Sequence, residues 1–155
     1  MVVRYHHDEV GVNSRLDSIQ AAILDCKLPH LDSYIASRQR AAAFYDNAFA
    51  GNPHLLIPTR SADSTHVFHQ YTLRLIDVDR DALRNALAEK GIPAMVYYPI
   101  PLHMQKAYQD PRYQTGDFPV AEKLADCVLS LPMHTELDEE QLTYICNHVL
   151  AFVNQ

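Results

Sequence analysis

The feature that most constrains the fold of this chain is a polar segment that leads directly into an amphipathic helix. The segment begins at Gly11, and after it apolar residues recur at spacings of three, four, one and four: Leu16, Ile19, Ile23, Leu24 and Leu28. This spacing places them on one face of a helix. Such a face is covered by another layer in a folded protein, so the first helix is expected to be an arm that joins two parts of a fold.

The start of this helix is also suited to an anion. Asn13 or Ser14 is the expected N-cap, because either side chain accepts a hydrogen bond from a free amide of the first turn. A helix N-terminus has unpaired amides and a positive dipole end. Asn13 adds an amide donor there, and Arg15 adds a cationic fork. Periodicity and capping alone also allow Asn13 to be only a cap and Arg15 only a surface charge.

Length and composition are those of one globular domain. The chain has 155 residues, of which 48% are hydrophobic and 21% charged, a normal balance for a protein with a buried core. The net charge of −6, without a basic cluster, argues against nucleic-acid binding. No apolar run has transmembrane length and the N-terminus has no signal-peptide core. A cytoplasmic protein without membrane contact is therefore expected.

Cysteine and histidine usage gives no indication of a metal site. The three cysteines, Cys26, Cys127 and Cys146, have no metal-ligand spacing, and their apolar surroundings predict buried free thiols in a reducing compartment. His66 and His69 are three residues apart in a strand-like run, which would direct them to opposite faces. We therefore expect no bound metal.

Strands alternate with helices along the rest of the chain. Apolar periodicity, caps and turn residues predict, in order, helices to Leu28 and over 30–50, strands over 55–57 and 66–76, a helix from Asp79 or Asp81 to Lys90, a strand over 92–97, a helix over 120–127, a strand over 128–131 and a helix after Asp138. This order predicts an α/β fold with helices packed on a small sheet. Residues 1–50 are expected to form an N-terminal segment and helical arm, and residues 51–155 a small α/β domain.

Three ordered segments resemble one family of enzymes. Gly11–Ala22 fits the pattern G-x-N-x-R-x-x-x-x-Q-A-A, Tyr98–His103 fits Y-P-x-P-L-H, and Leu129–His134 fits L-S-L-P-M-H. Together they resemble the nucleotide-sugar aminotransferases of the DegT/StrS-like group, which are fold-type I pyridoxal-phosphate enzymes. Members are considerably longer, so the resemblance implies that this chain is the small C-terminal domain, with its helical arm joining it to a large domain that precedes residue 1.

The resemblance also implies an activity. The complete enzyme would use pyridoxal phosphate to transfer an amino group, with glutamate as the expected donor, to a keto-sugar nucleotide. The resemblance is closest to enzymes that make amino sugars for lipopolysaccharide or O-antigen synthesis, and a UDP-linked sugar is the expected substrate. Members are homodimers whose active sites lie between the subunits.

Five residues acquire expected roles from the family motifs. Asn13 would reach the cofactor phosphate in the partner subunit's pocket, and Arg15 would face the nucleotide part of the substrate. Tyr98 matches a family tyrosine that reaches toward the diphosphate, whereas Tyr97 stands where close relatives often have histidine. His103 either hydrogen-bonds the diphosphate or braces its loop. Without the family, both tyrosines would be interpreted as packed side chains.

The lysine that forms the Schiff base is not expected within this chain. None of its four lysines, Lys27, Lys90, Lys106 and Lys123, matches the family position, so the chain alone should be inactive. The alternative from another functional class is a non-catalytic regulatory or scaffold module that keeps the fold for binding and dimerisation.

Overall fold

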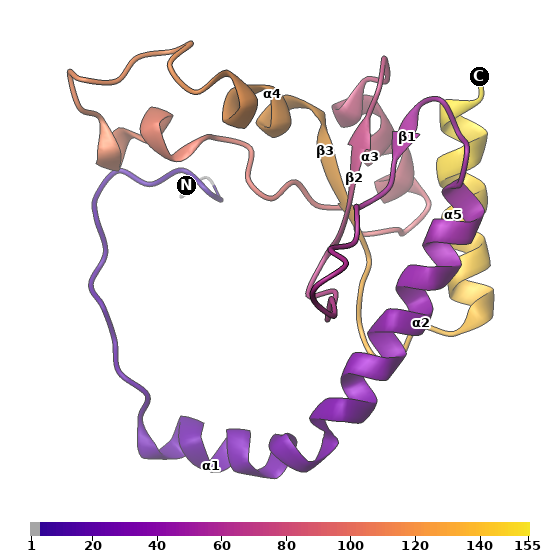
Figure 1. Ribbon diagram of the computed structural model, residues 1–155. Helices are drawn as coiled ribbons and strands as arrows, with labels where there is room; N and C mark the ends of the chain where they lie inside the picture. Colours follow the sequence, from indigo (N-terminus) through magenta and orange to yellow (C-terminus); the bar gives the residue numbers. More distant parts are fainter. Residues whose placement is uncertain (1–3) are drawn as a thin grey trace.

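The computed structural model describes residues 4–155 as a small α/β domain with a long N-terminal arm (Figure 1). The N-terminal part contains α1 (Ser18–Lys27), the 3-10 turn η1 (Leu28–His30) and α2 (Leu31–Phe49), and the C-terminal half of α2 packs into the core of the domain. The domain contains β1 (Leu55–Leu56), β2 (Tyr71–Leu75), α3 (Arg80–Glu89), the 3-10 turns η2 (Leu102–Met104) and η3 (Lys106–Tyr108), α4 (Pro119–Cys127), β3 (Val128–Leu131) and α5 (Glu139–Val153). The predicted fold class is confirmed.

An antiparallel sheet in the order β1-β2-β3 forms the centre of the domain. β2 pairs with both neighbours, and Leu73 lies opposite Leu129 of β3 in the register. Both leucines are fully buried. The sheet therefore has an apolar face, and α2, α3 and α5 supply the other side of the core through Tyr45, Phe49, Leu83, Leu87 and Val149, all of which are at most 1% exposed.

Side-chain caps fix where several helices begin. Of the two candidate caps, Asp79 and not Asp81 caps α3, accepting hydrogen bonds from the amides of Asp81 and Ala82. Asp138 caps α5 in a reciprocal capping box with Gln141. Each cap satisfies amides that have no partner inside the helix, so local sequence sets the boundaries of both helices.

The arm begins later than the sequence predicts. Asp17, not Asn13 or Ser14, is the N-cap of α1, and it forms a capping box with Gln20. Residues 10–17 form neither helix nor strand and run beside an open centre that the arm and the domain surround (Figure 1). No residue of α1 is buried, and its apolar stripe is exposed, with Ile19 at 76%. The predicted helix is present, but nothing within residues 4–155 covers its apolar face.

Two predicted strands are wrong in extent. Residues 66–70 are irregular and only Tyr71–Leu75 joins the sheet, because α2 side chains bind the carbonyl groups of this loop: Gln39 donates to His66 and Arg38 to Phe68. The predicted strand over 92–97 contains Pro93, which has no amide to donate. It keeps a single bridge, in which Met95 and Ser130 exchange hydrogen bonds of 2.9 and 2.7 Å.

Two predictions of burial are also corrected. Cys146 is buried, and burial raises the pKa of its thiol to about 12, but Cys127 is half-buried and Cys26 is exposed on α1. In α4 the apolar positions Val120 and Leu124 are exposed, and Ala125 is the buried residue. No helix among the described residues has both the length and the apolar character that crossing a membrane would require.

Candidate active site

The segment that carries Tyr97 and Tyr98 runs along the edge of the domain and lines a cavity of about 480 Å³. Pro101 and Leu102 continue the wall of this cavity, and Leu124 of α4 lies across it. The bridge between Met95 and Ser130 holds the start of the segment against β3. Two prolines follow the tyrosines, and because proline fixes its own φ angle they keep the chain extended.

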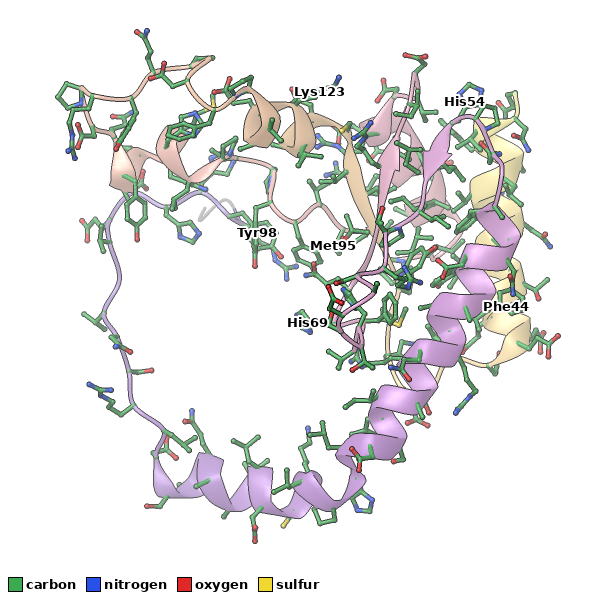
Figure 2. The ribbon with its side chains drawn as sticks, in the orientation of Figure 1. Phe44, His54, His69, Met95, Tyr98 and Lys123 are labelled. Atoms are coloured by element: carbon green, nitrogen blue, oxygen red, sulfur yellow. The ribbon has the colours of Figure 1, made fainter. Side chains whose placement is uncertain are left out.

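The two tyrosines differ in exposure. Tyr98 is 62% exposed and Tyr97 is half-buried. Their rings meet edge to face with centroids 5.7 Å apart, and both contact the ring of Tyr5. Partial desolvation raises the pKa of Tyr97, and a hydrogen bond with Tyr5 raises it further. Figure 2 shows Tyr98, Met95 and His69 along one side of the open centre. Tyr98 is therefore the more accessible of the two tyrosines.

His103 is held by its own loop. Its side chain is only 9% exposed, its Nε2 lies 3.0 Å from Oε1 of Glu122, and its ring packs 4.7 Å from that of Phe118. Glu122 also accepts hydrogen bonds from the amides of Gly116 and Phe118. These amide hydrogen bonds, more than the contact with His103, lower the pKa of Glu122. Of the two predicted roles, this geometry favours the brace.

Asn13 and Arg15 lie apart from the tyrosines. Both are exposed in the segment before α1, and neither makes a side-chain hydrogen bond or ion pair within residues 4–155. The sequence predicts that Asn13 and Arg15 lie at the start of the helix, beside its unpaired amides. Because the N-cap is Asp17, both residues precede the helix, and the first amides of α1 do not join them in one anion site. The side-chain donors of Asn13 and Arg15 are both available. Binding of the cofactor by Asn13 and of the substrate by Arg15 stays a prediction.

The described residues fit only part of a pyridoxal-phosphate site. Covalent attachment of the cofactor requires a lysine amine in an enclosed site. All four lysines, Lys27, Lys90, Lys106 and Lys123, are exposed, and Lys106 pairs with Asp8 at 2.9 Å. None of these lysines is enclosed for covalent attachment, and Asn13 as a donor to the phosphate stays a prediction. Residues 4–155 also contain no cluster of three His, Cys, Asp or Glu residues placed to hold a metal.

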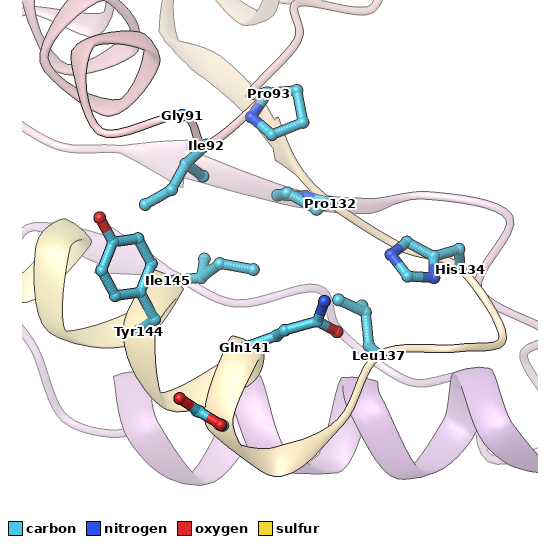
Figure 3. A pocket seen from close by; sticks show the side chains of 10 residues that line it. Gly91, Ile92, Pro93, Pro132, His134, Leu137, Gln141, Tyr144 and Ile145 are labelled. Carbon is cyan, nitrogen blue, oxygen red and sulfur yellow. The ribbon is translucent and has the colours of Figure 1, made fainter.

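A second, apolar cavity of about 360 Å³ lies between the start of α5 and the loop that follows α3 (Figure 3). Ile92, Leu137 and Ile145 form its apolar lining. Tyr144 closes one side, and its hydroxyl donates to the carbonyl of Lys90 at 3.2 Å. None of the predicted site residues contributes to this cavity, so it is separate from the segment of Tyr97 and Tyr98.

Comparison with known proteins places this geometry in a family. The chain matches the DegT/DnrJ/EryC1/StrS aminotransferase family over residues 1–150. The chain belongs to this family. Its structure superposes on S. venezuelae DesV, solved in complex with a ketimine intermediate, with a TM-score of 0.85 and 37% identity over 99% of this chain and 41% of that one. A family aminotransferase from Brucella abortus gives a TM-score of 0.80 and 35% identity over 99% of this chain and 40% of its own.

Curated relatives include enzymes and a regulator. A UDP-N-acetyl-3-dehydro-alpha-D-glucosamine 3-aminotransferase from Acidithiobacillus ferrooxidans is 49% identical over 91% of this chain and 37% of its own length. A pleiotropic regulatory protein from Geobacillus stearothermophilus is 44% identical over 96% of this chain and 40% of its own. The chain thus spans about 40% of these relatives. Pyridoxal phosphate is the cofactor of this aminotransferase family.

Sequence reasoning missed Glu122 and Phe118. Pro119 at the first position of α4 and an acid in its first turn are signals of a helix start, and both were present in the sequence. The hydrogen bond between Glu122 and His103 joins residues 19 apart. No spacing rule in the sequence indicates a contact of that kind.

Proposed function

We propose that this chain forms the C-terminal part of a pyridoxal-phosphate-dependent aminotransferase that converts a keto-sugar nucleotide to an amino-sugar nucleotide, with glutamate as the donor. The family match over residues 1–150 carries the proposal. A UDP-linked 3-keto sugar is the substrate class we favour, because the Acidithiobacillus ferrooxidans relative acts on such a compound. The product would serve lipopolysaccharide or O-antigen synthesis in the cytoplasm.

The residues of this chain would bind and orient the substrate. Arg15 is exposed with its donors available, and a guanidinium suits the two oxygens of a diphosphate. Tyr98 carries an exposed hydroxyl, which would donate one hydrogen bond to a phosphate oxygen. Asn13 would donate its amide to the cofactor phosphate. Pyridoxal phosphate, when bound, supplies the electron sink that amino transfer requires.

The exposed arm supports a site shared between two copies of the protein. The apolar stripe of α1 is uncovered within residues 4–155, and large exposed apolar patches mark contacts with other protein surfaces. Residues 9–17, which carry Asn13 and Arg15, lead directly into this helix. A homodimer that buries the stripe would place these residues at an interface, where they reach the partner's cofactor.

The complete protein that carries this segment provides the test. It is incubated with pyridoxal phosphate, glutamate and a UDP-linked 3-keto sugar, and formation of the amino sugar is followed by mass spectrometry. We expect one amino sugar per 2-oxoglutarate formed. Cofactor retention without turnover of any keto-sugar nucleotide would contradict the substrate class, and failure to retain the cofactor would contradict the activity.

The regulatory relative supports a second candidate. The Geobacillus stearothermophilus protein is named as a pleiotropic regulator, so a non-catalytic module that uses the same fold for binding and dimerisation is the alternative. A complete protein without a lysine at the cofactor position, and without cofactor absorbance, would favour this alternative over the enzyme.

A further inference from the structure

The first residues of the described chain run beside the loop that contains η2 and η3 (Figure 1). Residues 5–7 form a strap that is held by Gln105. The side-chain amide of Gln105 donates to the carbonyl oxygen of Tyr5 at 2.8 Å and accepts from the amide of His7 at 3.1 Å. The amide of Ala107 then donates to the carbonyl oxygen of His7 at 2.9 Å. Three hydrogen bonds therefore join two segments that lie 98–100 residues apart in the sequence.

Burial makes Gln105 the main attachment of the strap. Gln105 is 6% exposed and, with Ser130, is one of the two buried polar residues among residues 4–155. A buried side-chain amide is costly unless its N–H and C=O groups are paired, and the strap supplies a partner for each. The ion pair between Lys106 and Asp8 lies next to the strap, but both side chains are more than 70% exposed, so it contributes little. The strap is therefore fixed by Gln105 and not by the surface charges.

The strap places the ring of Tyr5 against both tyrosines of the candidate site. The centroid of this ring lies 5.9 Å from that of Tyr97 and 5.4 Å from that of Tyr98, and both contacts are edge to face. Tyr5 has a φ of 66°, a left-handed conformation that is rare for a bulky side chain and persists where the surrounding structure fixes it. Tyr5 and His7 also line the cavity of about 480 Å³ that Tyr97 and Tyr98 line. The strap is therefore part of the wall of the candidate site.

We propose that Gln105 is a positioning residue for Tyr98. Its side-chain amide holds the strap, and the Tyr5 ring in the strap fixes the place of the Tyr98 ring beside the cavity. A side chain that is 62% exposed has rotamer freedom to lose when it binds a ligand. A ring that is fixed beforehand reduces this ordering cost. The inference rests on the proposed function for what Tyr98 binds, whereas the position of Tyr98 is measured without a substrate.

Fluorine NMR of the complete protein, labelled with 3-fluorotyrosine, tests the position of Tyr98 without turnover. Tyr98→Phe identifies the resonance of Tyr98. Gln105→Leu removes both hydrogen-bonding groups and keeps a side chain of similar size, and in this variant the Tyr98 resonance should shift, because the field of the Tyr5 ring no longer acts on it. Tyr5→Gly should shift the same resonance, since glycine adopts the positive φ without strain and only the ring is lost.

Gln109→Leu is the matched control, because it makes the same substitution in the same loop. Gln109 is exposed, and its side chain makes no hydrogen bond within residues 4–155. Its loss should leave the Tyr98 resonance and the kinetics unchanged. Circular dichroism of each variant confirms that it is folded, and Tyr5→Gly carries the test if Gln105→Leu does not fold.

The KM of the complete protein for the sugar nucleotide tests the effect on binding. Gln105→Leu and Tyr5→Gly should each raise KM about two- to tenfold, the range that corresponds to ordering one side chain, and leave kcat unchanged. In the Tyr98→Phe background, Gln105→Leu should raise KM no further, because the hydroxyl that it positions is absent. A general loss of stability would not produce this dependence on Tyr98.

Three results would overturn the inference: an unshifted Tyr98 resonance in Gln105→Leu and Tyr5→Gly, equal effects of Gln109→Leu and Gln105→Leu, or additive increases of KM from Gln105→Leu and Tyr98→Phe. A shifted resonance in a protein that turns over no sugar nucleotide would support the positioning of Tyr98 and contradict the proposed function alone. Turnover whose KM is the same in Gln105→Leu as in the parent would contradict the role of Gln105 alone.

Discussion

Replacing Arg38 with methionine is expected to release two loops at once. Nη1 of Arg38 on α2 donates to the carbonyl oxygens of Phe68, His69 and Met133 at 3.0, 3.1 and 3.3 Å. This nitrogen carries two hydrogens, so two of the three bonds form at full strength at one time. A hydrogen bond from a charged group contributes about 1.5–3 kcal/mol, and the half-exposed position of Arg38 reduces that value. We expect Arg38→Met to lower the free energy of unfolding by about 2–4 kcal/mol.

Denaturant unfolding and amide exchange measure this effect. The amide of Phe68, which donates to Nδ1 of His66 at 2.9 Å, should exchange faster in Arg38→Met. Arg40→Met is the matched control on the same helix, because within residues 4–155 the exposed side chain of Arg40 donates only to the hydroxyl of Ser37, and it should cost less than about 0.5 kcal/mol. Equal losses in the two variants, with unchanged exchange at Phe68, would refute the role of Arg38 as a clamp.

Three further predictions concern the cofactor, the arm and Glu122. Borohydride should trap no stoichiometric pyridoxal phosphate on any lysine of this chain; modification of a single lysine would contradict this. Light scattering should show a dimer or larger species that Ile19→Lys dissociates, because the apolar face of α1 is uncovered; a monomeric parent would count against it. The folded pKa of Glu122 is lowered, so its stabilisation is present above the unfolded pKa and is lost as pH falls through the folded value. Glu122→Gln should therefore be less stable at pH 7, and its free energy of unfolding in urea should fall less than that of the parent as the pH is lowered. The same pH dependence in both proteins would argue against this contribution.

Elements fixed by local chemistry could be predicted from the sequence. The caps Asp79 and Asp138 act on amides two or three residues away; the sequence predicts Asp79 as one of two candidate caps and a helix that begins after Asp138. Asp17 was missed although Asp17-x-x-Gln20 has the same capping-box spacing as Asp138-x-x-Gln141. In that case the signal was present, and the nearby asparagine and serine led to the wrong boundary.

Features that depend on distant partners could not be predicted. Residues 66–70 have strand-like alternation, but side chains of α2 bind their carbonyl groups and Phe68 has a φ of 50°. The apolar stripe of α1 predicts burial, but nothing within residues 4–155 covers it. His103 had two possible roles from sequence, and only the position of Glu122 favours one of them.

Paired titrations of Asn13→Ala and Arg15→Ala in the complete protein test the central claim most directly. Both residues are exposed and make no side-chain hydrogen bond within residues 4–155. Asn13→Ala should weaken cofactor retention by about 0.5–1.5 kcal/mol, the net value of a neutral hydrogen bond. Arg15→Ala should raise KM for the sugar nucleotide, with a loss of roughly 1.5–3 kcal/mol for a charge-assisted contact, and leave the cofactor bound. If both variants bind cofactor and nucleotide sugar like the parent, neither residue belongs to the active site and the account of this segment is wrong.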